Sequence, residues 1–145
     1  MPAVPGLRSP HDTLGSLVYV GRMFDKIRLH DRGELPEDFH AALGVGLDKR
    51  AGAFLGIDYA ELKSKVLSGA SDEAILAWCF RTGISRNEHD CTVWSAFLQK
   101  LGWHDDRSEF LQDRVTKSGL ANRGIHTFFD LIEIDEDRPI RSFYA

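Results

Sequence analysis

The sequence lacks the features that would assign a chain of this size to a functional class. It has two cysteines, Cys79 and Cys91, and their spacing is typical of neither a zinc site nor a redox site. No apolar run reaches the length of about 18 residues that a membrane-spanning helix needs. The first residues show no basic stretch followed by an apolar one, so no secretory signal is expected. These absences predict a cytoplasmic protein with two reduced, buried thiols.

Excess positive charge is also missing. The 145 residues include 18 lysines and arginines against 22 aspartates and glutamates, which gives a net charge of −4. A protein whose main role is to hold a phosphate backbone needs a basic field, so nucleic acid is not expected as a partner.

Motifs for catalysis and for cofactor binding are absent as well. The sequence has no Gly-x-Ser-x-Gly elbow and no phosphate-binding loop, and no two histidines lie three or four positions apart. The sequence therefore indicates no catalytic residue, no metal site and no cofactor, and it leaves open whether the protein is an enzyme.

What the sequence does contain is a regular series of signals for helix starts and stops. Capping residues such as Asp58 and Ser71 alternate with glycines such as Gly56 and Gly69, while the period-two alternation of strands is scarce. We expect an all-α, compact single-domain bundle of about six or seven short helices. The domain would span residues 1–145, with an N-terminal extension at 1–8 and a C-terminal tail at 138–145.

The first helix is predicted to begin near Ser9, where a capping box is followed by proline at the first helical position. It would run to about His30. The stretch 17–20 favours β structure but lies inside this helical frame.

Three further segments carry specific expectations. Ser85 and Glu88 are predicted to form the capping box of a later helix. In that helix, one stripe is expected to face the core, and it consists of Trp94, Phe97, Leu98 and Leu101. The acidic stretch 130–137 is interpreted as a solvated helical face, with Arg138 and Arg141 offsetting some of its repulsion.

The first predicted helix places four charged residues close together: Arg22, Asp25, Lys26 and Arg28. One interpretation is a site for an acidic ligand. Arg28 or Arg22 would bind a carboxylate or phosphate in bidentate fashion, Lys26 would add a point charge, and Asp25 would orient an arginine. The other interpretation is structural, with Asp25 paired to a neighbouring arginine. Both interpretations remain open.

Several short segments, taken in order, carry a resemblance to a known family. The segments are 21–23, 25–28, 54–58, 71–73 and 127–132, which read GRM, DKIR, FLGID, SDE and TFFDLI. They resemble a family of small bacterial proteins classified as a domain of unknown function. The resemblance covers residues 9–137 and implies a compact helical domain in a bacterium, without an activity or a catalytic residue.

Two classes of function stay open. The favoured class is a binding or regulatory module that contacts a protein partner through a helical face or the tail, where Phe143 and Tyr144 could also support homo-oligomers. The alternative is a protein, or enzyme, that binds an acidic small molecule through the charged first helix. A binding module predicts an exposed apolar patch, whereas an anion site predicts cationic groups that converge in a pocket.

Overall fold

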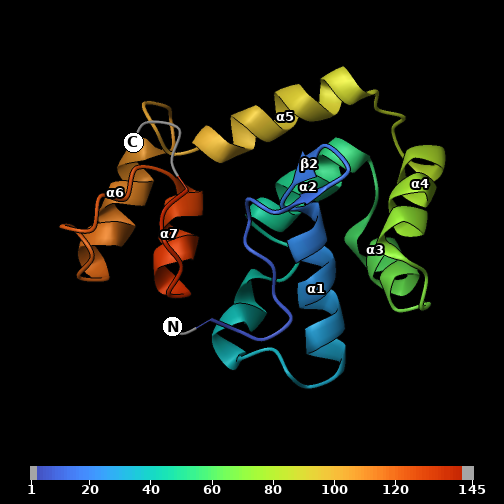
Figure 1. Ribbon diagram of the computed structural model, residues 1–145, viewed down its shortest axis with the longest axis horizontal. Coiled ribbons are helices and arrows are strands. Elements are labelled where there is room, and N and C mark those ends of the chain that lie inside the picture. The colour runs from blue at the N-terminus through green and yellow to red at the C-terminus, as the bar shows by residue number, and fades with distance from the viewer. Residues whose placement is uncertain (1–2, 142–145) are drawn as a thin grey trace.

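The computed structural model describes residues 3–141, which form a mostly helical fold with one short hairpin. Within these residues, the prediction of an all-α bundle is confirmed apart from that hairpin. Figure 1 shows α1 near the centre, α3 and α4 on one side of it, and α6 and α7 on the other. The elements are β1 (Thr13–Leu14), β2 (Leu17–Val18), α1 (Val20–Asp31), the 3-10 helix η1 (Glu37–Ala42), α2 (Leu47–Leu55), α3 (Tyr59–Val66), α4 (Asp72–Thr82), α5 (Glu88–Lys100), α6 (Ser108–Lys117) and α7 (Phe128–Asp135).

The start of the chain differs from the prediction, because Ser9 does not begin a helix. Instead, the Ser9 carbonyl accepts a hydrogen bond of 3.1 Å from the Asp12 amide, which closes a turn. The antiparallel hairpin of β1 and β2 follows, and α1 begins only at Val20. The physical reason is tertiary, since the Val18 amide donates to the Ser95 hydroxyl of α5 at 3.1 Å and holds β2 in an extended form.

Two of the predicted helix starts are confirmed and one is shifted. The side chains of Asp58 and Ser71 accept backbone hydrogen bonds at the starts of α3 and α4. The predicted capping box at Ser85 is wrong, because Asn87 caps α5 and pairs reciprocally with Asp90. The register of the box is therefore two residues later than expected.

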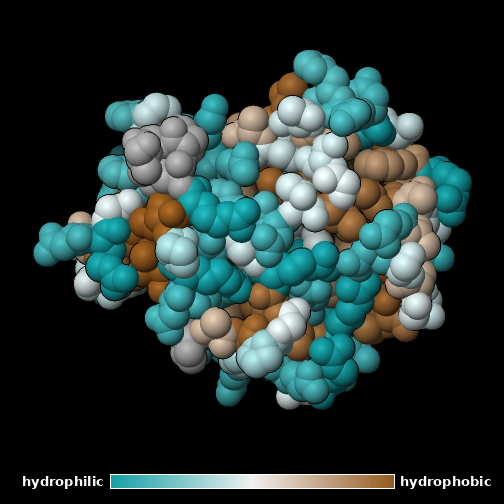
Figure 2. All heavy atoms as spheres, viewed as in Figure 1, coloured by the Kyte–Doolittle hydropathy of each residue, from teal (hydrophilic) through white to brown (hydrophobic). Residues whose placement is uncertain are grey.

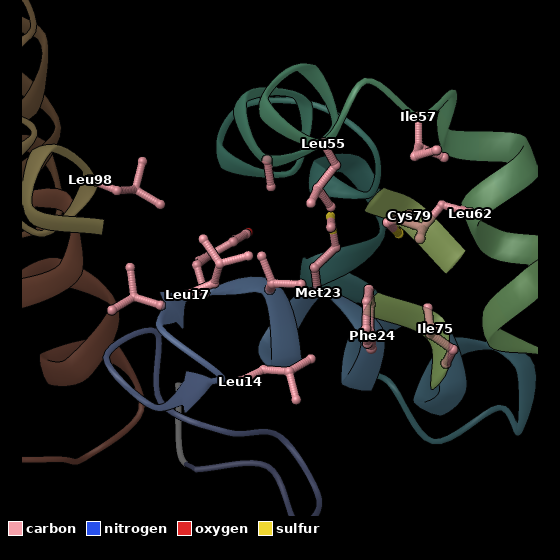
Figure 3. Close-up of a cluster of buried hydrophobic side chains, with 14 of the residues drawn as sticks. Leu14, Leu17, Met23, Phe24, Leu55, Ile57, Leu62, Ile75, Cys79 and Leu98 are labelled. Carbon is pink, nitrogen blue, oxygen red and sulfur yellow. The ribbon is translucent and has the colours of Figure 1, made fainter. Parts of the chain in front are cut away.

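The main apolar core forms where α1 crosses the surrounding helices. Figure 3 shows Met23 and Phe24 of α1 beside side chains from α2, α3 and α4. Cys79 of α4 is part of this cluster, and burial raises the pKa of its thiol to about 11. Both cysteines are free and buried, as predicted.

The predicted core stripe of α5 is partly wrong. Leu98 and Leu101 are buried, but Trp94 is half-buried and the Phe97 side chain is exposed. The helix buries a face that includes Ser95, whose hydroxyl donates to the Ser16 carbonyl at 2.9 Å. A polar residue thus occupies the face of α5 that packs on the hairpin. Phe97, two positions further along the helix, therefore lies on the other side, towards solvent.

The segment predicted as an N-terminal extension packs on the body of the protein. Val4 and Leu7 form a second apolar cluster with Leu29, Leu35 and Phe39. Of the predicted tail, residues 138–141 lie within the described part, whereas Phe143 and Tyr144 lie outside it. Among residues 3–141, no helix is both long and apolar enough to cross a membrane.

Candidate functional site

The first of the predicted charged residues, Arg22, forms a buried bidentate ion pair with Glu136. Its two terminal nitrogens donate to the Glu136 carboxylate at 2.9 and 2.6 Å, and the two side chains are only 3% and 2% exposed. Burial opposes the charged form of Glu136, but the hydrogen bonds and charges of Arg22 and Arg138 outweigh it and lower the pKa of Glu136. This pair joins α1 to the residue that follows α7.

The acidic stretch 130–137 is therefore not the solvated face that the sequence indicated. Asp130, Glu133 and Glu136 are all buried. Asp130 belongs to the capping box of α7, and Arg138 donates to both Glu133 and Glu136, at 3.3 and 2.8 Å. Arg138 offsets repulsion among the acidic residues, as expected. It does so inside the protein, where buried carboxylates need direct partners.

Lys26 belongs to a second buried polar cluster. Its ammonium nitrogen lies 2.7 Å from a carboxylate oxygen of Asp48 and donates to the Tyr19 hydroxyl at 3.1 Å. The Tyr19 hydroxyl donates to the same Asp48 oxygen at 2.6 Å, and the Gly44 amide donates to the other oxygen at 3.0 Å. Burial lowers the pKa of Lys26, although Asp48 opposes this effect. The cluster attaches α1 to the start of α2.

Asp25 and Arg28 belong to a third cluster, which is partly open to solvent. The Arg8 guanidinium donates to both Asp25 oxygens at 2.9 and 3.0 Å. Arg8 and Arg28 each donate to one oxygen of Asp72, at 2.8 and 2.6 Å. Gly21 makes room for this arrangement, because a Cβ atom there would lie 2.7 Å from the Arg8 guanidinium.

The four predicted residues thus fall into three clusters, of which Asp25 and Arg28 share one, and they are not brought together at one pocket. Their partners from other elements are Arg8, Asp48, Asp72 and Glu136, which sequence reasoning missed. No local signal could have found Glu136, since it lies 114 positions from Arg22. The site for an acidic ligand stays a prediction, while the geometry shows each charge engaged by protein groups. Among residues 3–141, no group of three or more acidic, histidine or cysteine side chains is placed to hold a metal.

A second region differs from these charged clusters because it is apolar and open to solvent. An open groove of about 500 Å³ lies between α2 and α5, and we name it the aromatic groove. Its lining residues are Phe54, Arg86, His89, Asp90, Val93, Trp94 and Phe97. Val93 and Phe97 are large apolar side chains that are 55% and 48% exposed. In Figure 2 the surface at the top of the view, where α5 runs in Figure 1, is mixed, with a few brown apolar atoms among pale and teal ones.

Aromatic rings and arginines organise the aromatic groove. The rings of Phe54 and Trp94 stack with centroids 4.8 Å apart. The Arg86 guanidinium lies 4.4 Å from the Phe54 ring centroid, and the Arg50 guanidinium lies 5.9 Å from that of Phe97. Within the described chain, neither arginine forms an ion pair with a carboxylate. The groove therefore offers an apolar floor with two cations available at its edge.

These features define a small helical domain with a buried ionic interior and an exposed aromatic groove. Residues 4–138 match the model of the family described as Domain of unknown function (DUF5069), and the chain belongs to this family. No curated protein matches the chain.

Proposed function

We propose that the protein is a binding module whose aromatic groove holds an amphipathic segment of a protein partner. The observation that carries this proposal is the exposure of Val93 and Phe97 beside the stacked pair of Phe54 and Trp94. An apolar patch of this kind is what the favoured class of function predicted. The bacterial origin and the cytoplasmic location expected from the sequence belong to this proposal.

The chemistry of the groove specifies the segment. Grooves lined by aromatic side chains accept the apolar face of a helix, with anchors that repeat every three or four residues. Aromatic and arginine side chains also dominate the binding energy of protein interfaces. Because Arg50 and Arg86 have no carboxylate partner in the described chain, we expect acidic residues beside the apolar anchors of the segment.

The proposal is tested by selecting peptides from a random display library on the whole protein. The expected consensus holds large apolar residues at helical spacing next to aspartate or glutamate. A selected peptide should bind Phe97→Ser at least about tenfold more weakly, a loss of about 1.4 kcal/mol. Phe110→Ser is the matched control, since Phe110 is a comparably exposed phenylalanine, on α6, outside the groove. Peptides that bind both variants equally would contradict the proposal.

A second candidate, an acidic small molecule bound at Arg8 and Arg28, is favoured by one observation. The side chains of these arginines are 31% and 26% exposed, and each donates a hydrogen bond to the Asp72 carboxylate. A ligand carboxylate would have to replace Asp72 there. Thermal-shift screening of wild type and Arg28→Ala against acidic metabolites and nucleotides tests this candidate, because a ligand of the folded state raises the melting temperature. A shift that the variant loses would support it, and no shift with any compound would contradict it.

A further inference from the structure

We propose that His30 and His40 form a binding site for a divalent transition-metal ion such as zinc. The centres of their rings lie 4.6 Å apart, with an angle of 75° between the ring planes. His30 is half-buried in the last turn of α1, and His40 is exposed on η1, beyond the turn that ends α1. The pair shares no residue with the aromatic groove, so the inference goes beyond the proposed function.

The distance between the two rings fits a shared ion. Zinc binds an imidazole nitrogen at about 2.0–2.1 Å, so two imidazoles that hold one ion must have ring centres within about 6.5 Å of each other. The pair of His30 and His40 meets this condition. Imidazole nitrogen suits zinc, copper and nickel ions, whereas calcium and magnesium ions prefer oxygen. The chemistry of the pair therefore specifies the class of metal.

Each ring has a nitrogen that can bind the ion. The Nε2 atom of His40 lies 2.9 Å from the Leu35 carbonyl oxygen, which can only accept a hydrogen bond. His40 Nε2 therefore carries a hydrogen, and in the neutral ring the lone pair is on Nδ1. Metal-binding histidines commonly donate their second nitrogen in this way, which fixes the orientation of the ring. Within residues 3–141, the His30 ring forms no hydrogen bond or ion pair, so its nitrogens are available.

The apolar packing beside the pair holds both backbones in place. Leu29 precedes His30, and Phe39 precedes His40. Leu29 and Phe39 are both buried in the second apolar cluster, so the two histidines project from segments that already pack on each other. A site built on fixed segments needs little additional ordering when it binds its ligand.

The charges around the pair favour a cation. Residues 31–38 include acids at positions 31, 34, 37 and 38, and their single arginine, Arg32, is paired with Glu34 at 3.0 Å. The C-terminal end of a helix also carries partial negative charge, and His30 lies at that end of α1. The two imidazoles are the protein ligands. Because zinc in proteins is usually four-coordinate, water would fill the other positions.

Zinc titration of the whole protein tests the proposal. We expect one zinc ion to bind per molecule and to raise the melting temperature, because it joins the end of α1 to η1. His30→Ala and His40→Ala should each bind zinc at least about tenfold more weakly, a loss of about 1.4 kcal/mol. The double variant should lose little more, since removing either imidazole already breaks the chelate. His89→Ala is the matched control, because His89 is an exposed histidine in the aromatic groove, and this variant should bind zinc as the wild type does.

A second measurement does not depend on the folding of the variants. In NMR spectra of the nitrogen-labelled wild type, zinc should shift His40 Nδ1 and one ring nitrogen of His30, while His40 Nε2 keeps its hydrogen. The variants are checked by thermal melting without zinc. Failure of the wild type to bind zinc, or zinc binding that folded His30→Ala and His40→Ala both retain, overturns the proposal. Ring nitrogens of His30 and His40 that zinc leaves unshifted also overturn it.

Discussion

The charged residues of α1 and the aromatic groove use arginine in opposite ways. Arg22 lies in the interior and donates two hydrogen bonds to the Glu136 carboxylate, so it joins α1 to the residue that follows α7. Arg86 lies at the edge of the groove, against the face of Phe54, and has no acidic partner among residues 3–141. Spacing along a helix therefore does not show which charges pair within the fold. In the proposed function, the arginines without a carboxylate partner among residues 3–141 mark the binding surface.

The largest effect is expected from breaking the buried pair. Among residues 3–141, Glu136→Leu leaves the Arg22 guanidinium with the Arg8 carbonyl as its one hydrogen-bond acceptor, at 3.0 Å. Removing one member of a buried pair costs about 3–5 kcal/mol of unfolding free energy. Urea denaturation measures this loss. The double variant Arg22→Met/Glu136→Leu should recover much of it, and a double variant as unstable as the single one would contradict this account.

The next effect is a loss of stability in acid caused by His11. Burial, and after it the charge of Arg141, lower the pKa of this histidine from 6.5 to about 4, although Asp12 opposes the shift. As the pH falls, His11 therefore binds its proton at a higher pH in the unfolded state than in the folded state. Stability should fall as the pH drops from 6.5 to about 4, by at most about 3 kcal/mol.

This pH dependence is measured as the difference in unfolding free energy between wild type and His11→Leu. The leucine variant keeps the apolar contact with Phe129 and cannot be protonated. Between pH 7 and pH 4, the wild type should lose unfolding free energy relative to His11→Leu. A constant difference over this range would show that His11 does not contribute.

A smaller effect is expected where the charges of α1 meet solvent. Arg28→Ala removes the contacts of 2.6 Å to Asp72 and 3.8 Å to Asp25, but Arg8 still donates to both carboxylates. Partly exposed pairs contribute at most about 1 kcal/mol. Urea denaturation of this variant beside Glu136→Leu ranks the two kinds of pair. Equal losses of unfolding free energy in the two variants would contradict the expected difference between a buried and a partly exposed ion pair.

The smallest effect on stability is expected in the groove. Phe97→Ser changes a side chain that is about half exposed and lies outside the apolar core, so the unfolding free energy should stay within about 0.5 kcal/mol of wild type. Binding of a selected peptide should still fall. Thermal melting and a binding titration on the same sample separate the two properties. A large loss of stability would make Phe97 a core residue after all.

The sequence was sufficient for the helical class and for several helix starts, because caps such as Ser71 act locally. It was insufficient where distant residues decide the outcome. Ser95 holds β2 extended from 77 positions away, and Ser95 also turns Phe97 outward. The candidate charged residues could be found from their spacing on one helix. Their partners could not, since tertiary contacts bring Glu136 to Arg22.

The central claim is that the aromatic groove binds and that the charges of α1 are structural. Backbone chemical-shift mapping with a selected peptide tests it most directly, on wild type and on Phe97→Ser. We predict that the largest shifts occur at the amides of Val93, Trp94 and Phe97, and that they disappear in the variant. Largest shifts at residues 22–28, unchanged in Phe97→Ser, would contradict the claim and place the binding site on α1.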